Sequence, residues 1–197
     1  MSGSTASGST DPGSTASGGT ASGGTARRVV LALGSNLGDR LATLQGGVGA
    51  LLGAPGLALV ALSPVYETVP VGGPPQPEYL NAVLIADTML PAADVLLRGQ
   101  AAEAAFGRVR QEVWGPRTLD VDVIVYGDVV SDDPELTLPH PRASERAFVL
   151  APWLDADPDA EIPGQGRVAA LLEAVVARSG GQPGVRRLAG VQLGPPA

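Results

Sequence analysis

The stretch RTLDVDVIVY, residues 117–126, alternates apolar and polar side chains before it becomes fully apolar. Residues two apart on a strand point to the same side. One face is therefore predicted to carry the apolar side chains of Leu119, Val121, Val123 and Val125. Asp120 and Asp122 share the other face, with Cα atoms about 6.5–7 Å apart. The stretch predicts a strand that buries one side and presents two carboxylates on the other.

The elements upstream of this strand set the fold. Apolar runs at residues 28–33, 57–66 and 79–87 predict three more strands. A helix is predicted after Asp39, a plausible N-cap, and a second one after Pro91. The order β-α-β-β-α-β predicts an α+β fold, a ferredoxin-like split βαβ sandwich with helices packed on a mainly antiparallel sheet. Two further helices are predicted at residues 145–154 and 167–177.

The chain divides into a domain and two predicted tails. Residues 1–26 are almost all Ser, Gly, Thr and Ala and are predicted to be a disordered tail. Residues 27–178 form the predicted domain, and 179–197, rich in Gly and Pro, a loose C-terminal tail. The N-terminal segment lacks the features of a signal peptide, and no stretch reaches the roughly 20 apolar residues that span a bilayer. We therefore expect a cytoplasmic protein with no membrane contact.

Composition excludes several classes of chemistry. The 197 residues include no Cys, so thiolate nucleophiles and Cys-bound metal clusters are impossible. The chain has one histidine, His140, and no Lys, which excludes a multi-histidine metal site and a lysine-containing phosphate loop. A net charge of −7 argues against nucleic-acid binding.

The paired aspartates are the strongest candidate for chemistry. Two carboxylates at this spacing repel each other unless a cation lies between them, and Mg²⁺ prefers oxygen ligands. Two such ions could be bridged by Asp120 and Asp122. Taken alone, the pair is equally compatible with the solvated polar face of an edge strand. Three arginines lie in or just after the preceding loop, namely Arg108, Arg110 and Arg117, and guanidinium groups bind phosphate through paired hydrogen bonds. Together they indicate a polyphosphate site.

Other candidates have two readings each. Gln100 and Glu103 share a helix face, which is an ordinary solvent face or part of the site. Trp114 either packs in the core or closes over a planar ligand as a lid. Tyr79 and Asn81 share a strand face that suits a heterocycle, or they are a core tyrosine and a turn asparagine. His140 lies between two prolines, which favours an exposed, rigidly placed imidazole over a core one.

Several motifs occur in a characteristic order. They are LALGSNLGD (31–39), YETVPVG (66–72), QPEYLNAV (76–83), GRVR (107–110), WGPRTLDVD (114–122) and LPHPRASERAF (138–148). In this combination the chain closely resembles the 6-hydroxymethyl-7,8-dihydropterin pyrophosphokinase family of folate biosynthesis. The resemblance covers nearly all of the predicted domain and neither tail.

The resemblance implies a transferase that moves pyrophosphate from ATP to the hydroxymethyl group of the pterin and releases AMP. It implies two Mg²⁺ ions on Asp120 and Asp122, and catalytic roles for these two residues with Arg108 and Arg117. The implied ATP-binding residues are Gln100, Glu103, Arg108, Arg110, Trp114, Arg117, Thr137, His140 and Arg146. The implied pterin-binding residues are Thr68, Val69, Val71, Tyr79, Asn81, Trp114 and Phe148, with the valines acting through their backbone.

Two other functions compete with this hypothesis. Split βαβ folds also bind RNA, but such modules expose aromatic residues and carry basic surfaces, whereas this chain has 4% aromatic residues and a negative charge. An inactive family member serving as an interaction domain would keep the fold without turnover. We expect a monomeric enzyme whose partners are ATP and the reduced pterin.

Overall fold

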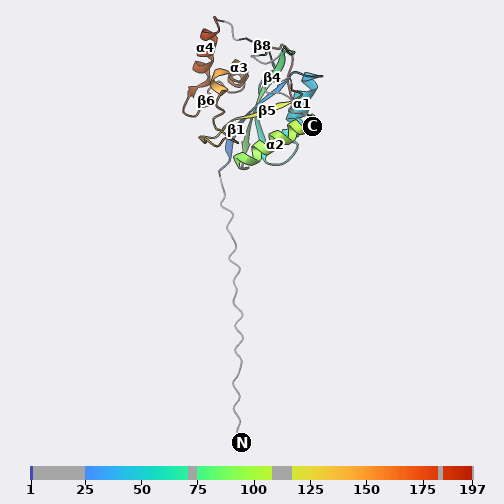
Figure 1. The fold of residues 1–197 in the computed structure, drawn as a ribbon, viewed down its shortest axis with the longest axis vertical. Coiled ribbons are helices and arrows are strands. Elements are labelled where there is room, and N and C mark those ends of the chain that lie inside the picture. Colours follow the sequence, from blue (N-terminus) through green and yellow to red (C-terminus); the bar gives the residue numbers. More distant parts are fainter. Residues whose placement is uncertain (2–24, 71–74, 108–116, 182–183, 197) are drawn as a thin grey trace.

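The sheet is the centre of the fold in the computed structural model, which describes residues 1, 25–70, 75–107, 117–181 and 184–196 (Figure 1). Its six strands run in the order β5-β1-β4-β3-β8, with β2 also paired to β4, and every pair is antiparallel. The strands are β1 (Arg27–Ser35), β2 (Leu57–Leu62), β3 (Tyr66–Thr68), β4 (Tyr79–Thr88), β5 (Asp120–Tyr126) and β8 (Val185–Arg187).

The predicted split βαβ fold is confirmed, but the strand predicted at residues 57–66 is two strands, β2 and β3, so the observed order is β-α-β-β-β-α-β. Helix α1 (Arg40–Leu52) connects β1 to β2, and α2 (Ala92–Ala105) connects β4 to β5. Strand β4 pairs with β1 along one edge and with β2 and β3 along the other, which is the arrangement of a split βαβ unit. Asp39 caps α1 as expected, because its carboxylate accepts a hydrogen bond of 3.0 Å from the Ala42 amide.

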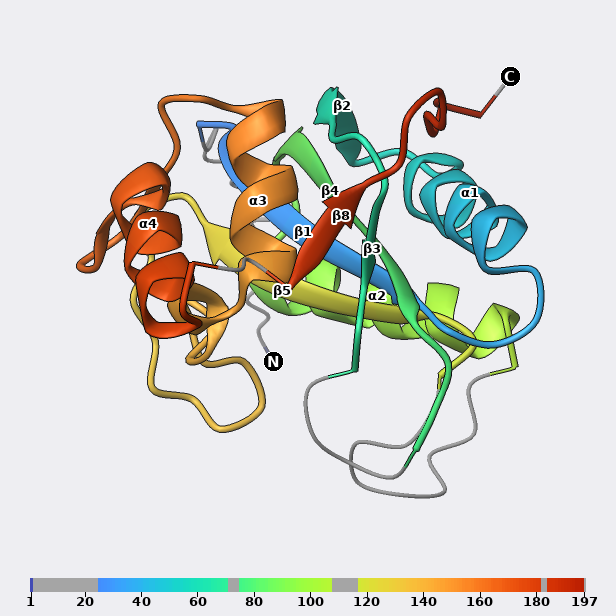
Figure 2. The ribbon, with the colours of Figure 1, turned by 90° about the horizontal axis from the view of Figure 1, so that it is seen from above.

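Two layers of helices cover the two faces of the sheet. Helices α1 and α2 lie on one side, and α3 (Ala147–Ala156) and α4 (Val168–Arg178) lie on the other (Figure 2). A short 3₁₀ helix (Ala143–Glu145) precedes α3, and the small hairpin of β6 (Glu161–Ile162) and β7 (Gly166–Arg167) joins α3 to α4. Among the described residues, no helix is long and apolar enough to cross a membrane.

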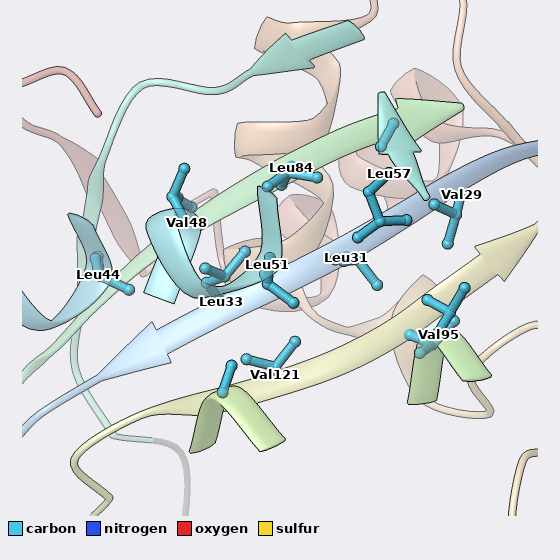
Figure 3. Packing of buried hydrophobic residues seen from close by; sticks show 14 of the residues in the cluster. Val29, Leu31, Leu33, Leu44, Val48, Leu51, Leu57, Leu84, Val95 and Val121 are labelled. Atoms are coloured by element: carbon cyan, nitrogen blue, oxygen red, sulfur yellow. The ribbon is translucent and has the colours of Figure 1, made fainter. Parts of the chain in front are cut away.

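Each face of the sheet has its own apolar core. Under α1 and α2, side chains from β1 and β4 pack against Leu44, Val48 and Leu51 of α1, all of them fully buried (Figure 3). The second core lies under α3 and α4 and contains Val83 of β4 and Leu150 of α3. Along the strands, its residues alternate with those of the first core. A strand in this sheet therefore sends successive side chains to opposite cores.

The prediction that Leu119, Val121, Val123 and Val125 share one face of β5 is wrong for Val125. Leu119, Val121 and Val123 belong to the core under α1 and α2, but Val125 belongs to the opposite core. The register between β1 and β5 shifts between Val30 and Leu31, so β5 contains one extra residue. Such a bulge reverses the alternation, and Ile124 and Val125 both face α3 and α4.

The C-terminal segment also differs from the loose tail predicted for residues 179–197. Strand β8 pairs with β3 in this segment, and Leu193 is 8% exposed in the core. The Gln45 side chain forms two hydrogen bonds with the backbone of Gly194, at 2.8 and 3.0 Å. Strand β8 thus pairs with the otherwise open edge of β3. The Gly- and Pro-rich sequence around β8 does not indicate this strand. The predicted N-terminal tail lies almost entirely outside the described residues.

Candidate active site

A pocket opens on the α3 and α4 side of the sheet, over one end of β1, β4 and β5. Nine predicted site residues line it: Thr68, Val69, Tyr79, Asn81, Arg117, Asp120, Asp122, Arg146 and Phe148. The fold therefore brings together residues that are up to 80 positions apart in the sequence, from Thr68 to Phe148. The structure places both aspartates and two aromatic residues, Tyr79 and Phe148, in one hollow.

Small residues of β1 create this hollow. Gly34 is paired with Asp120 on one side and with Asn81 on the other, and Ala32 is paired with Asp122. A Cβ atom on Gly34 would lie 3.2 Å from the Asn81 Oδ1 atom. Because β1 contributes almost no side chain here, the larger polar side chains of its neighbours border an open space.

Cationic side chains contact the aspartates. Arg117 Nη1 lies 2.5 Å from Asp120 Oδ1, and Arg146 Nη1 lies 3.4 Å from Asp122 Oδ2. The His140 Nε2 atom is 3.8 Å from the same Asp122 oxygen. Asp120 therefore has a close ion pair, whereas Asp122 has only longer contacts.

The environment of Asp122 disfavours its charged form. Burial raises the pKa of its carboxyl, and the negative charge of Asp120 raises that pKa further, against the lowering effects of His140 and Arg146. Burial lowers the pKa of His140 below its usual value of 6.5, so the imidazole is neutral at pH 7. A cation placed between the two carboxylates would relieve this repulsion.

The other wall of the pocket suits a flat, polar ring. Asn81 is 6% exposed and donates a hydrogen bond of 2.9 Å from Nδ2 to Thr68 Oγ1. Tyr79 precedes it on the same strand face, and Phe148 lies in the first turn of α3. The guanidinium carbon of Arg146 is 5.4 Å from the centre of the Phe148 ring. This wall combines aromatic surface with an amide and a hydroxyl.

Some predicted site residues lie away from the pocket lining. Glu103 is 5% exposed and accepts a hydrogen bond of 2.8 Å from the Val121 amide, which supports β5 from the side of α2. Gln100 is exposed on α2, and the Thr137 hydroxyl donates to the Asp133 carbonyl oxygen at 3.0 Å. Val71, Arg108, Arg110 and Trp114 lie outside the described residues.

Three polar residues at the site were not predicted. Gln76 and Arg142 line the pocket, and Asn36 is a buried asparagine directly after β1 that bonds to Gln76. A signal for each was present, because Asn36 and Gln76 belong to the GSN and QPEYLN motifs and Arg142 follows the His140–Pro141 pair. Their roles depend on contacts between distant segments, which spacing does not reveal.

The pocket combines paired aspartates and arginines with an aromatic wall. Such a site in an α+β domain is suited to bind a polyphosphate beside a ring-shaped substrate. The family model described as 7,8-dihydro-6-hydroxymethylpterin-pyrophosphokinase (HPPK) matches residues 30–158. The chain belongs to this family and is therefore a pyrophosphokinase enzyme.

Relatives of known name agree with this assignment. The chain is 53% identical over 151 residues to the 2-amino-4-hydroxy-6-hydroxymethyldihydropteridine pyrophosphokinase of Mycobacterium leprae, covering 71% of this chain and 77% of that relative. It is 42% identical over 148 residues to the protein of the same name from Pseudomonas aeruginosa, covering 75% of this chain and 91% of the relative.

A solved structure shares the fold. A crystal structure of a Plasmodium falciparum HPPK-DHPS triple mutant with SDX-DHP matches with a TM-score of 0.65 at 13% identity. The match covers 85% of this chain and 48% of the Plasmodium chain, so this chain spans about half the length of that protein. At this identity the likeness concerns the fold alone.

Proposed function

We propose that this enzyme is Mg²⁺-dependent and that Asp120 and Asp122 hold two metal ions. The reaction is pyrophosphoryl transfer to the hydroxymethyl group of 6-hydroxymethyl-7,8-dihydropterin in folate biosynthesis, with ATP as the co-substrate and AMP as the second product. The observation that carries the proposal is the meeting of two carboxylates with Arg117 and Arg146 in the pocket that also contains Tyr79 and Phe148.

The aspartate pair fits Mg²⁺ better than softer metals. In the described part of the chain, no group of three or more His, Cys, Asp and Glu side chains gathers to form a complete protein site. Mg²⁺ commonly takes one or two carboxylates and completes its coordination with water and substrate phosphates. The raised pKa of Asp122 is consistent with a carboxyl pair that is under-neutralised without a cation. When bound, Mg²⁺ would neutralise phosphate charge and polarise the transferred group.

Cationic side chains are proposed to hold the triphosphate of ATP. Arg117 and Arg146 can exchange their aspartate contacts for phosphate oxygens as the ligand enters. His140, neutral and fixed by a 2.8 Å hydrogen bond from its amide to the Ile124 carbonyl oxygen, can donate one hydrogen bond without adding charge. We assign the same ligand to Gln100, Glu103, Arg108, Arg110, Trp114 and Thr137, as the family resemblance implies.

The pterin is proposed to lie between Tyr79 and Phe148. Asn81 and Thr68 can bond to the polar edge of its ring, and the backbone of Val69 and Val71 completes that edge. Trp114 is assigned to closing the site. The arrangement holds the hydroxymethyl oxygen near the phosphate-binding arginines, and positioning of this kind is a large part of catalysis in phosphoryl transfer.

In the proposed mechanism the hydroxymethyl oxygen attacks the β-phosphorus of ATP in line. The bond between that phosphorus and the α–β bridging oxygen breaks, and this oxygen leaves with AMP. Arg108 and Arg117 stabilise the negative charge that spreads over the transferred group. The proton of the hydroxymethyl group is released to solvent water in this step.

We further propose that the enzyme acts as a monomer in the cytoplasm. ATP and the reduced pterin are small molecules, and the pocket needs no macromolecular partner to bind them.

Counting bound metal ions tests the metal assignment directly. We expect about two Mn²⁺ ions per chain, in place of Mg²⁺, when a non-hydrolysable ATP analogue is present. Electron paramagnetic resonance of free Mn²⁺ measures this number. Asp122→Ala should remove at least one ion, whereas the exposed Asp128→Ala should remove none. Unchanged metal binding in Asp122→Ala would refute the assignment.

A further inference from the structure

Asn36 connects the two walls of the pocket. It lies directly after β1, is 1% exposed, and does not line the pocket itself. The Arg117 amide donates a hydrogen bond of 2.8 Å to Asn36 Oδ1, and the Asn36 amide donates one of 3.1 Å to the Arg117 carbonyl oxygen. Asn36 therefore holds the backbone of Arg117 through two bonds in opposite directions.

The other end of the Asn36 side chain holds the segment before β4. Its Nδ2 atom donates to the Pro77 carbonyl oxygen at 3.2 Å and to Gln76 Oε1 at 2.9 Å. The Tyr79 hydroxyl donates to the same Gln76 oxygen at 3.0 Å. A continuous chain of hydrogen bonds thus runs from Arg117 through Asn36 and Gln76 to Tyr79.

Only asparagine chemistry satisfies both ends of this arrangement. A backbone amide can only donate and a backbone carbonyl can only accept, so Arg117 and Pro77 together fix which side-chain atom of Asn36 is oxygen and which is nitrogen. The nitrogen then fixes Gln76 with its oxygen toward Asn36. That oxygen is the acceptor that holds the Tyr79 hydroxyl.

We infer that Asn36 is a positioning residue that fixes the Tyr79 ring relative to Arg117. This inference rests on the proposed function, in which Tyr79 contacts the pterin and Arg117 contacts the transferred phosphate. Asn36 touches neither substrate. By holding Tyr79 and Arg117, it sets the distance between the bound pterin, which carries the attacking oxygen, and the guanidinium group that stabilises the phosphate. Small errors in such a distance slow a reaction strongly.

A purely structural role is the alternative, because any buried asparagine with this many bonds stabilises the fold. The two roles differ in what a substitution changes. Loss of a structural contact lowers the melting temperature alone. Loss of a positioning contact also weakens pterin binding and slows single-turnover transfer, and it does so through Gln76 and Tyr79.

The experiment compares Asn36→Ala, Tyr79→Phe and their double variant with Ser63→Ala. Ser63 is a suitable control because it is also buried, at 3% exposed, and bonded at 2.8 Å to the Val83 amide, but it does not line the pocket. Thermal melts, nucleotide affinity, pterin affinity in the presence of a non-hydrolysable ATP analogue, and single-turnover rates are measured for each variant.

We expect Asn36→Ala to weaken pterin binding about tenfold and to slow single turnover, while nucleotide affinity without pterin changes less than about threefold. The double variant should bind pterin no more weakly than Asn36→Ala, because both substitutions interrupt the same chain of bonds. Ser63→Ala should lower the melting temperature without changing pterin affinity.

Pterin affinity and single-turnover rates in Asn36→Ala that match those of Ser63→Ala would overturn the inference, and so would losses that add fully in the double variant. If Asn36→Ala does not fold, Gln76→Ala takes its place in the same comparison with Tyr79→Phe, and additive losses there overturn the inference as well. A wild-type protein that binds no pterin would overturn both the inference and the proposed function. A wild type that binds and turns over while Asn36→Ala behaves like the control would overturn the inference alone.

Discussion

Leu33 and Gly34 are neighbours on β1 and both border the pocket, yet the Leu33 side chain is 1% exposed in the core under α1 and α2, whereas Gly34 lies between Asp120 and Asn81 at the pocket surface. Val121 and Asp122 on β5 differ in the same way. One face of these strand ends is filled with large apolar side chains. On the other face, the small residues of β1 leave a space that larger side chains of β4 and β5 border. The comparison shows that core and site share the same strands and are separated by the alternation of side chains.

This division predicts that substitutions on the two faces have separable effects. Changes on the core face should lower stability and leave ligand binding intact in the folded protein. Changes on the pocket face should alter binding or turnover and leave stability nearly intact.

The largest effect is expected from Asp122→Ala. Turnover of the variant should fall about a thousandfold or more. The metal ions that neutralise the phosphate charge lose a carboxylate ligand, which raises the transition-state free energy by several kcal/mol. Its melting temperature should not fall, since a half-buried carboxylate that lies beside the like charge of Asp120 is removed. Steady-state rates and thermal melts check both points. The control is Val121→Ala, which should lower the melting temperature and leave turnover of the folded protein nearly unchanged. Near wild-type turnover of Asp122→Ala with Mg²⁺ would contradict the metal assignment.

A large loss of stability is expected from Leu33→Ala. Removing this buried side chain should cost about 2–5 kcal/mol of the free energy of unfolding, through lost burial and an added cavity. Urea denaturation measures this, with Val130→Ala as the control, because Val130 is 69% exposed and should change stability by less than about 0.5 kcal/mol. Nucleotide affinity at low temperature should stay unchanged. A variant that is stable but binds nucleotide poorly would break the comparison.

A moderate effect is expected from Gly34→Ala. The added methyl group would press on Asn81 at 3.2 Å and fill part of the pocket, so pterin affinity should fall several-fold with little change in stability. Gly49→Ala is the matched control, because nothing lies within 4 Å of its added Cβ on α1. That control should be stabilised by up to about 1 kcal/mol. Calorimetric titration with pterin and thermal melts separate the two, and equal pterin affinities would count against the account.

The smallest effect is expected in the pH dependence of the metal-free protein. The folded-state pKa of Asp122 is raised above its unfolded value of 3.8, so the free energy of unfolding falls as the pH rises from 3.8 to the raised pKa, and the penalty is complete above it. Asp122→Asn removes the penalty and should melt a few degrees higher than wild type near neutral pH. The difference should vanish at a pH below the unfolded value. Thermal melts in a chelator across pH test this, and a difference that persists at low pH would point to another cause.

Sequence patterns predicted much of this division because alternation is a local property. Asp120 and Asp122 were expected on one face and Val121 on the other, and the structure has them so. The position of Val125 was missed because a bulge depends on how β5 pairs with β1. Strand β8 was missed because three residues become a strand only when β3 offers them an edge.

The pocket itself was predicted less fully than the fold. The aspartates and arginines carry a chemical signal in the sequence, so a polyphosphate site could be inferred from them. Asn36 and Gln76 act through bonds between segments 40 positions apart, and only folding brings these together. Glu103 was expected to face ATP, and this stays a prediction. The structure shows the Glu103 carboxylate accepting a hydrogen bond from the Val121 amide, a contact no spacing rule contains.

The most direct test of the central claim is the identity of the nucleotide product. The protein is incubated with ATP, Mg²⁺ and 6-hydroxymethyl-7,8-dihydropterin, and the nucleotides are separated by chromatography. We expect AMP to accumulate in step with pyrophosphorylated pterin, and neither to form when the pterin or the divalent metal is omitted. Asp122→Ala under the same conditions should produce neither. Accumulation of ADP in place of AMP, or AMP formed at the same rate by Asp122→Ala, would contradict the account.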